Sequence, residues 1–302
     1  MLEEAQRLAR AGRRDEAVAL VRRSAAEGDL EAAFALANWH LYGLYVPRDV
    51  GAALALLRAA AASGHGDSAR LLAGLAEPAE ARAALAAVGD PESARQLALI
   101  DAMDEGERPC EILSEDPPVR LVRGLFSAEE CAWLGSRAAP LLRPSTIVDA
   151  ASGRPRPDPV RTSDGMNFGP GQMDAVVAAL TRGIHRAVGI APSCGEPLHV
   201  LRYMPGQEFR PHLDALPGVS NQRAWTALVY LNDGYEGGET IFPELGLSVR
   251  ARAGDALIFR NVDCDGRADP RTRHAGAPVT RGAKWLASRW IRERPFDPFA
   301  PA

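Results

Sequence analysis

The sequence predicts an α+β protein in which an all-α repeat domain precedes a β-rich domain. Residues 1–100 are rich in Ala, Leu and Arg, and apolar residues recur there at helical spacing. Internal similarity at an offset of 36 residues indicates helix-turn-helix repeats in this part. After Gly195, short β-branched segments alternate with turn residues, a pattern typical of a sandwich or barrel.

The repeats are visible as matching segments. Ala25–Ala37 aligns with Ala61–Ala73, and Gly89–Ala98 is a shortened third copy. In each copy a Gly is expected to end one helix, and small Ala side chains let the next helix pack closely. The stretch Leu41–Ala53, with Ala59–Gly64 after it, resembles a Sel1-like repeat, a relative of the tetratricopeptide repeat, and the resemblance covers about residues 1–100. Two roles stay open for residues 1–100: a cap that stabilises its neighbour, or a surface that binds a peptide.

Residues 101–118 are acidic and end in two prolines, which predicts a linker before a second domain at 119–302. The residues Ser127-Ala-Glu-Glu130 form a capping box before a predicted helix. Residues 144–170 are rich in Gly, Pro, Asp and Arg, and we expect a long mobile loop there. A second helix is predicted at Met173–Val188.

Short strands are predicted for the rest of this domain. Their expected positions are Val119–Leu125, Leu198–Tyr203, Ala224–Leu231, Leu247–Ala251, Ala256–Phe259 and Trp285–Ile291. Two helices followed by about eight such strands fit a double-stranded β-helix, a jelly-roll variant with helical support.

Composition excludes some classes of partner. The net charge of -4 gives no reason to expect nucleic acid, and no run approaches the ~20 apolar residues of a membrane span. Residues 1–14 are highly charged, unlike a secretory signal, and the four cysteines lie far apart in the sequence. We therefore expect a cytoplasmic protein with reduced thiols and no membrane partner.

His212-Leu-Asp214, followed by His274, supplies two imidazoles and one carboxylate. On an extended strand, residues i and i+2 point to the same face, so His212 and Asp214 can reach one ion. Non-haem iron oxygenases hold Fe(II) with two His and one carboxylate. The remaining histidines are expected to be structural or to lie in the repeats: His185, His199, His40 and His65.

Lys284 lies ten residues after His274, in a segment where apolar residues alternate. Between Ala283 and Trp285 it is expected to point inward, and a buried ammonium needs an anion. A carboxylate of a co-substrate would supply that anion.

A series of ordered motifs follows along the second domain: Glu196–Tyr203, Gly206–Asp214, Arg223–Asn232, Gly237–Phe242, Gly254–Phe259 and His274–Trp285, with Arg161-Thr-Ser163 upstream. Together they resemble the prolyl 4-hydroxylase family over about residues 118–294. The resemblance implies Fe(II), 2-oxoglutarate and O2 as cofactors, ascorbate as a candidate further cofactor, and release of succinate and CO2.

The resemblance also implies residue roles. His212, Asp214 and His274 would bind Fe(II) and be catalytic. Lys284, helped by Tyr203 and Thr240, would bind 2-oxoglutarate. Five further residues match positions that face substrate in the family: Arg161, Ser163, Glu196, Arg223 and Trp290. Two positions depart from the family pattern, Phe209 where Tyr is common and Arg292 where a His follows the Trp-Ile pair.

The sequence is therefore interpreted as a dioxygenase that hydroxylates a prolyl residue in a protein or peptide, which the helical repeats would help to hold. Two alternatives stay open. The same chemistry could act on a free amino acid or a natural-product intermediate. The protein could also be a repeat-based interaction protein without turnover, although the complete ligand set argues against this.

Overall fold

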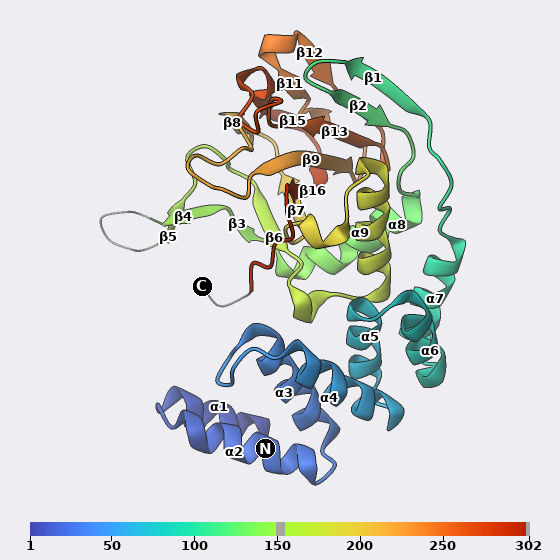
Figure 1. Ribbon diagram of the computed structural model, residues 1–302, viewed down its shortest axis with the longest axis vertical. Helices are drawn as coiled ribbons and strands as arrows, with labels where there is room; N and C mark the ends of the chain where they lie inside the picture. Colours follow the sequence, from blue (N-terminus) through green and yellow to red (C-terminus); the bar gives the residue numbers. More distant parts are fainter. Residues whose placement is uncertain (149–154, 300–302) are drawn as a thin grey trace. The chain divides into compact units, whose positions relative to one another are not determined.

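The computed structural model describes residues 1–148 and 155–299, which form two compact units (Figure 1). The helical unit comprises residues 1–104, 169–179 and 298–299. The sheet unit comprises the described residues of 105–168 and 180–297. The α+β fold class predicted from the sequence is confirmed.

Helical hairpins make up most of the helical unit. Its helices are α1 (Leu2–Arg10), α2 (Arg14–Ala26), α3 (Leu30–Tyr42), α4 (Val50–Ala62), α5 (Gly66–Leu75), α6 (Pro78–Val88) and α7 (Pro91–Ala102). Gly28, Gly64 and Gly89 separate α2 from α3, α4 from α5 and α6 from α7, with φ of 95°, 87° and 64°. These backbone angles favour glycine and end each first helix, as predicted. The assignment to the Sel1 type stays a prediction.

The helical unit also binds a segment that the sequence placed in the second domain. The Tyr42 hydroxyl donates to Gln172 Oε1 at 2.8 Å and accepts from the Gly171 N–H at 2.9 Å. The Ala175 N–H donates to Gln96 Oε1 at 3.3 Å. Residues 169–179 therefore belong to the helical unit, which the predicted division at residues 101–118 did not anticipate.

The sheet unit contains the remaining elements. Its helices are α8 (Ala128–Ala138) and the end of α9 (Ala175–Val188), with short 3-10 helices η1 (Ala139–Leu141), η3 (Pro192–Cys194), η4 (Pro243–Leu245) and η5 (Pro270–Thr272); η2 (Pro170–Gln172) lies in the helical unit. Its strands are β1 (Cys110–Ser114), β2 (Val119–Val122), β3 (Arg143–Pro144), β4 (Thr146–Val148), β5 (Pro155–Pro157), β6 (Asp164–Asn167), β7 (His199–Tyr203), β8 (Phe209–His212), β9 (Arg223–Tyr230), β10 (Glu236–Gly237), β11 (Thr240–Phe242), β12 (Leu247–Val249), β13 (Ala256–Arg260), β14 (His274–Gly276), β15 (Val279–Arg281) and β16 (Lys284–Arg292).

Two antiparallel sheets enclose the core of this unit. Within the described residues, the larger has eight strands in the order β1-β2-β13-β9-β16-β7-β6-β3, and the smaller has four in the order β12-β11-β14-β8. Buried apolar side chains from both sheets pack together, including Tyr230 and Leu257 from the larger and Phe242 and Val249 from the smaller. This arrangement is a double-stranded β-helix, as predicted.

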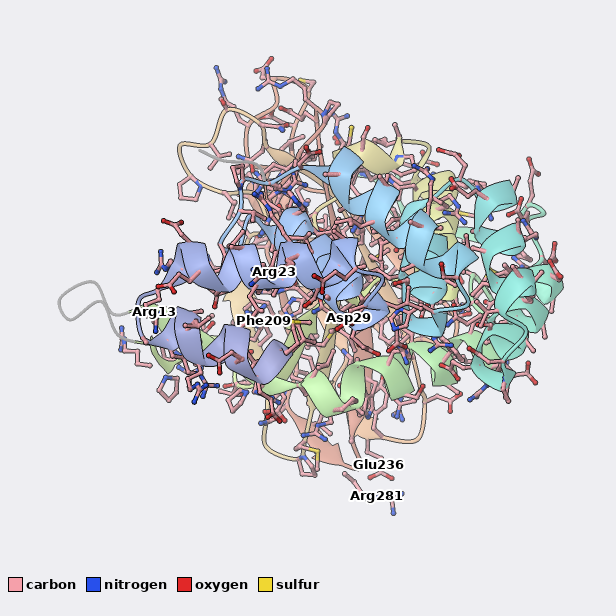
Figure 2. The ribbon with its side chains drawn as sticks, turned by 90° about the horizontal axis from the view of Figure 1, so that it is seen from below. Arg13, Arg23, Asp29, Phe209, Glu236 and Arg281 are labelled. Carbon is pink, nitrogen blue, oxygen red and sulfur yellow. The ribbon has the colours of Figure 1, made fainter. Side chains whose placement is uncertain are left out.

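Helix α9 covers the outer face of the larger sheet. Arg120 of β2 donates to the Ala187 carbonyl at 2.6 Å, and Arg289 Nε of β16 lies 3.3 Å from His185 Nε2. The opposite face of β16 is therefore turned toward the space between the two sheets. At an exposed edge, Glu236 of β10 and Arg281 of β15 form an ion pair (Figure 2).

Two predictions need correction. The expected linker contains β1, which pairs with β2 and extends the larger sheet. The expected mobile loop at 144–170 contains β4, β5 and β6 and part of β3, and its residues 149–154 lie outside the described residues. No helix of the described residues is long and apolar enough to cross a membrane. The four cysteines are free thiols.

Candidate active site

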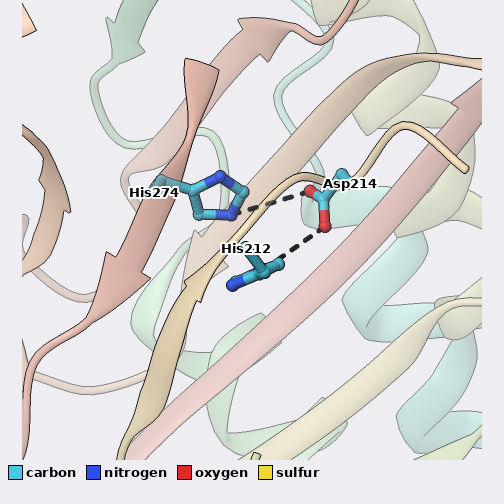
Figure 3. Close-up of side chains that lie close together, drawn as sticks. All are labelled: His212, Asp214 and His274. Carbon is cyan, nitrogen blue, oxygen red and sulfur yellow. Dashed lines mark ion pairs between the residues drawn. The ribbon is translucent and has the colours of Figure 1, made fainter. Parts of the chain in front are cut away.

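Two strands of the smaller sheet bring the predicted histidines together. His212 ends β8 and His274 begins β14, and the two residues are paired directly across the strands. Asp214 lies just beyond the end of β8. His212 Nε2 lies 3.5 Å from Asp214 Oδ1, and His274 Nε2 lies 3.7 Å from Asp214 Oδ2 (Figure 3). One atom from each side chain falls within 4.8 Å of the others, which fits the ligand set of one metal ion.

Backbone carbonyls fix the tautomer of both imidazoles. His212 Nδ1 lies 2.8 Å from the Arg210 carbonyl, and His274 Nδ1 lies 3.0 Å from the Thr272 carbonyl. A carbonyl can only accept, so each Nδ1 carries the proton and each Nε2 presents a lone pair toward Asp214. This is the tautomer that a metal ligand requires. Burial lowers the pKa of His274 to about 4, although Asp214 opposes the shift, so its imidazole is neutral near pH 7.

Asp214 is oriented by a hydrogen-bonded chain. The Thr226 hydroxyl donates to Asp214 Oδ2 at 2.6 Å, and Asn261 Nδ2 donates to the Thr226 hydroxyl at 2.9 Å. Burial alone would raise the pKa of Asp214, but His274, His212 and the Thr226 hydroxyl together hold it below the usual value. The carboxylate is therefore ionised near pH 7 and held in one orientation, as an anionic metal ligand must be.

Lys284 points inward, as predicted. Its side chain is 3% exposed, and Nζ donates to the Gly238 carbonyl at 2.7 Å. Nζ also lies 5.2 Å from the centre of the Tyr230 ring and 5.8 Å from that of Tyr203. Burial lowers the pKa of Lys284 to about 8, although Glu239 opposes the shift. No carboxylate of the described residues forms an ion pair with Lys284, so this ammonium fits a ligand that brings its own carboxylate.

The other two residues predicted to bind 2-oxoglutarate lie beside Lys284. Tyr203 is paired with Lys284 across β7 and β16. The Thr240 hydroxyl lies 2.8 Å from the Tyr230 hydroxyl, and both groups are buried. Tyr230 was not identified from the sequence. It lies on the predicted strand Ala224–Leu231, where the alternation of side chains could have indicated which residues face the cavity. Lysine, tyrosine and threonine together give this end of the site donors for a carboxylate.

One cavity connects this end with the histidines. Its volume is about 490 Å³, including the space at its mouth. The lining residues are Leu201, Tyr203, Phe209, His212, Asp214, Leu228, Thr240, His274, Gly276, Ala277, Lys284, Leu286, Ser288 and Trp290. The predicted metal and 2-oxoglutarate residues therefore share one cavity, and its leucines give it an apolar wall that disfavours water.

Of the five predicted substrate residues, Trp290 lines this cavity and the other four are not among its lining residues. Glu196 accepts two hydrogen bonds from Arg223, at 2.6 and 2.8 Å. The Arg223 guanidinium lies 4.0 Å from the centre of the Trp290 ring. Arg161 lies 5.5 Å from the centre of the Phe209 ring, and the Ser163 hydroxyl is buried 3.3 Å from that of Ser145. Arg223 and Arg161 therefore contact the wall at Trp290 and Phe209, and Glu196 holds Arg223 in place. Ser163 contacts Ser145, which does not line the cavity.

The two departures from the family pattern also have defined places. Phe209 stacks on the His212 imidazole, with ring centres 3.5 Å apart and planes 17° apart. Arg292 is 6% exposed, and its Nε lies 2.6 Å from Glu196 Oε1. Phe209 therefore restrains a predicted metal ligand, and Arg292 shares Glu196 with Arg223.

The remaining histidines lie away from His212, Asp214 and His274, which we call the ligand triad. His185 Nδ1 contacts the Ile190 carbonyl at 3.0 Å, and His199 lies 5.8 Å from Trp290 between ring centres. His40 and His65 are in the helical unit. Thr226 and Asn261 were missed from the sequence, because nothing in their local pattern indicates that they support Asp214.

Comparison with known proteins shows similarity to one family of oxygenases. Residues 198–292 match the 2OG-Fe(II) oxygenase superfamily, and this range includes the ligand triad and Lys284. Probable prolyl 4-hydroxylase 3 of Arabidopsis thaliana is 36% identical over 210 residues, which cover 62% of this chain and 73% of the relative. Prolyl 4-hydroxylase 5 of the same plant is 36% identical over 220 residues, with coverage of 65% and 75%.

Solved structures are also similar. A viral collagen prolyl hydroxylase from Paramecium Bursaria Chlorella virus-1, in complex with 2-oxoglutarate, is 27% identical and covers 58% of this chain and 95% of its own, with a TM-score of 0.47. A prolyl-4-hydroxylase from Pseudomonas putida is 22% identical, with coverage of 66% and 99% and a TM-score of 0.41.

Proposed function

Because the chain belongs to the prolyl 4-hydroxylase family of 2-oxoglutarate- and iron-dependent oxygenases, we propose that it hydroxylates a prolyl residue in a protein or peptide. The observation that carries the proposal is the shared cavity, in which His212, Asp214 and His274 lie with the buried ammonium of Lys284. Two imidazoles and a carboxylate suit Fe(II), and an ammonium without an anion suits a dicarboxylate co-substrate.

Each residue of the cavity has a task in this reaction. When bound, iron with 2-oxoglutarate and O2 supplies the oxidation that places oxygen on a C–H bond and releases succinate and CO2. His212, Asp214 and His274 hold the metal on one side and leave its other positions free. Lys284 and Thr240 bind and orient the co-substrate carboxylate. The apolar wall positions the target C–H and limits the access of water.

A direct experiment measures succinate release by iron-loaded protein with 2-oxoglutarate and a proline-containing peptide. We expect succinate and a peptide that gains one oxygen atom on proline, located by tandem mass spectrometry. A matched peptide with Ala in place of Pro is the substrate control, and the Asp214→Ala variant is the enzyme control. Oxidation of the Ala peptide at the same rate would contradict the proposal.

A small molecule is the alternative substrate. The same cavity would also serve a free amino acid or a natural-product intermediate, because the residues that would hold the metal and 2-oxoglutarate set no requirement for a polypeptide. In the same assay, succinate release stimulated by free amino acids but by no peptide would favour this alternative.

We further propose that the helical unit contacts the polypeptide substrate. The turn after α3 exposes two adjacent apolar side chains, Leu44 and Tyr45, which are 50% and 48% exposed. Tyr45→Ser should raise KM for a protein substrate and leave KM for a short peptide unchanged; equal effects on both would contradict the proposal. Two further proposals are ascorbate dependence of turnover, tested by its omission, and a cytoplasmic location, tested by cell fractionation.

A further inference from the structure

Residues on the inner face of β16 mark the two ends of the cavity. Side chains at alternate positions of a strand point the same way. Four such residues of β16 line the cavity: Lys284, Leu286, Ser288 and Trp290. Trp290 is paired across the strands with Thr226, whose hydroxyl holds Asp214. The ligand triad of His212, Asp214 and His274 therefore lies level with Trp290, and the end of the cavity proposed to bind 2-oxoglutarate lies at Lys284.

Arg292 follows two residues after Trp290, on the side away from Lys284, where the pairing of β16 with β9 becomes irregular. Arg292 is paired with Arg223 of β9, and both contact Glu196. The Arg223 guanidinium lies 4.0 Å from the centre of the Trp290 ring, which forms part of the cavity wall. We call these three charged residues, Glu196, Arg223 and Arg292, the arginine cluster. None of its three residues lines the cavity; the cluster contacts the cavity wall through Trp290, at the end opposite Lys284.

The arginine cluster carries a surplus positive charge, because two guanidinium groups share one carboxylate. Glu196 and Arg292 are 8% and 6% exposed, so water compensates this charge poorly. Arg289 adds a further buried cation near Glu196. An anion bound at this end of the cavity would be stabilised by the surplus.

The neighbouring part of the wall lies beside a further guanidinium group, that of Arg161. Arg161 lies over the Phe209 ring, and no carboxylate of the described residues forms an ion pair with its guanidinium. The Asp158 carboxylate is held at the backbone of this segment, where its Oδ1 accepts the N–H groups of Val160 and Arg161, at 2.8 and 3.1 Å. Phe209 contributes no hydroxyl. This wall therefore matches an acceptor on the substrate rather than a donor.

We infer that the arginine cluster selects a polypeptide with an acidic side chain within two residues of the hydroxylated one. The inference rests on the proposed function. Trp290 and Arg292 are two residues apart on a strand, which is on the order of 7 Å. Alternate side chains of an extended peptide are separated by the same distance. When the target residue of the substrate lies at the metal, an acidic side chain two residues away can therefore reach the arginine cluster.

The test compares proline peptides that differ only in Glu or Gln, placed one or two residues before or after the proline. With the complete iron-loaded enzyme, at least one Glu peptide should have kcat/KM about tenfold above that of its Gln partner, mainly through KM. The ratio should shrink as salt is added, because the selecting interaction is between charges.

Variants locate the preference in the arginine cluster. Arg292→Gln should bring the Glu-to-Gln ratio of kcat/KM close to one, and Arg292→Lys should retain part of it. Arg281→Gln removes the same charge from an exposed pair on β15 and should keep the ratio of the original protein (Figure 2). Because each ratio is measured within one variant, partial loss of folded protein does not alter it.

The outcomes separate this inference from the proposed function. Equal kcat/KM for Glu and Gln peptides at every position, with proline hydroxylated, would overturn the inference alone. A Glu preference that persists in Arg292→Gln would overturn the role of the arginine cluster. Absence of turnover with any peptide would overturn the inference together with the prolyl substrate.

Discussion

Lys284 offers an unusually direct test of the site. The chain contains 35 lysine and arginine residues, and Lys284 is the only lysine among them. Protein grown on isotope-labelled lysine therefore gives a single side-chain NMR signal whose titration belongs to one residue. Burial lowers the pKa of Lys284 from 10.5 to about 8, and we expect the ligand-free protein to titrate near that value.

The free-energy cost of burying the Lys284 ammonium depends on pH, because its protonation is linked to folding. A fall from 10.5 to about 8 corresponds to ~3 kcal/mol of unfavourable free energy for the buried ammonium. Below pH 8 Lys284 is protonated in both states and this cost is complete. Between pH 8 and 10.5 the unfolded chain binds more protons, so this contribution to the free energy of unfolding becomes more favourable as pH rises. Cys131 and buried tyrosines titrate in the opposite sense at high pH, so the measurement is the difference between wild type and Lys284→Met.

The same variant should lose affinity for 2-oxoglutarate. A carboxylate beside the ammonium favours its charged form, so binding should be tightest below pH 8 and weaken as pH rises through 8. Loss of a buried charge partner costs about 2–4 kcal/mol, or roughly thirtyfold to a thousandfold in Kd. The ligand-free Lys284→Met protein should nevertheless be up to ~2 kcal/mol more stable at pH 7, after about 1 kcal/mol for the Gly238 carbonyl left unpaired.

Titration calorimetry with Mn(II) in place of Fe(II) measures affinity without turnover, and urea unfolding measures stability. If Lys284→Met is more stable than wild type and binds 2-oxoglutarate more weakly, Lys284 is a ligand-binding lysine. If Lys284 were purely structural, its replacement would lower the stability of the protein as well as its affinity. A lysine signal that titrates near 10.5 in the ligand-free protein, or an unchanged Kd in Lys284→Met, would refute the reasoning.

Three further changes test other parts of the sheet unit. Asp214→Ala should abolish coupled hydroxylation, measured as succinate and oxidised peptide, and wild-type turnover would remove Asp214 from the ligand set. Thr226→Val deletes the 2.6 Å hydrogen bond to Asp214 and should weaken Mn(II) binding by about tenfold in a metal titration, whereas an unchanged Kd would show that this bond does not orient the carboxylate. Ser127→Ala removes the capping box of α8 and should lower the free energy of unfolding by about 1 kcal/mol in urea, and an unchanged midpoint would argue against it.

The longer elements could be predicted because their own sequences carry the pattern. Apolar residues at helical spacing predicted a helix at Met173–Val188, and α9 begins at Ala175 because the Asp174 carboxylate accepts the Val177 N–H. Alternation predicted β9 and β16 to within a residue or two of their ends. Burial on one or both faces of these elements is a local property of the sequence.

The short strands could not be predicted in the same way. Elements such as β8, β10 and β14 have two to four residues and become strands only by pairing with distant segments. The metal site shows the consequence, because the sequence predicted Asp214 on an extended strand together with His212. The strand ends at His212, and Asp214 is instead held by Thr226 of β9. The grouping predicted from the sequence agrees with the geometry, but the support for Asp214 depends on the tertiary fold.

The substrate side shows most clearly what a motif does not reveal. The resemblance implied that Glu196 and Arg223 face substrate, yet no spacing in the sequence indicates that they bind each other. Glu196 has contacts of 2.6, 2.8 and 2.6 Å with two guanidinium groups, which occupy both of its oxygens. A carboxylate engaged in this way orients arginines rather than accepting from a substrate. The contribution of Glu196 to specificity is therefore indirect, through the position of Arg223 against Trp290.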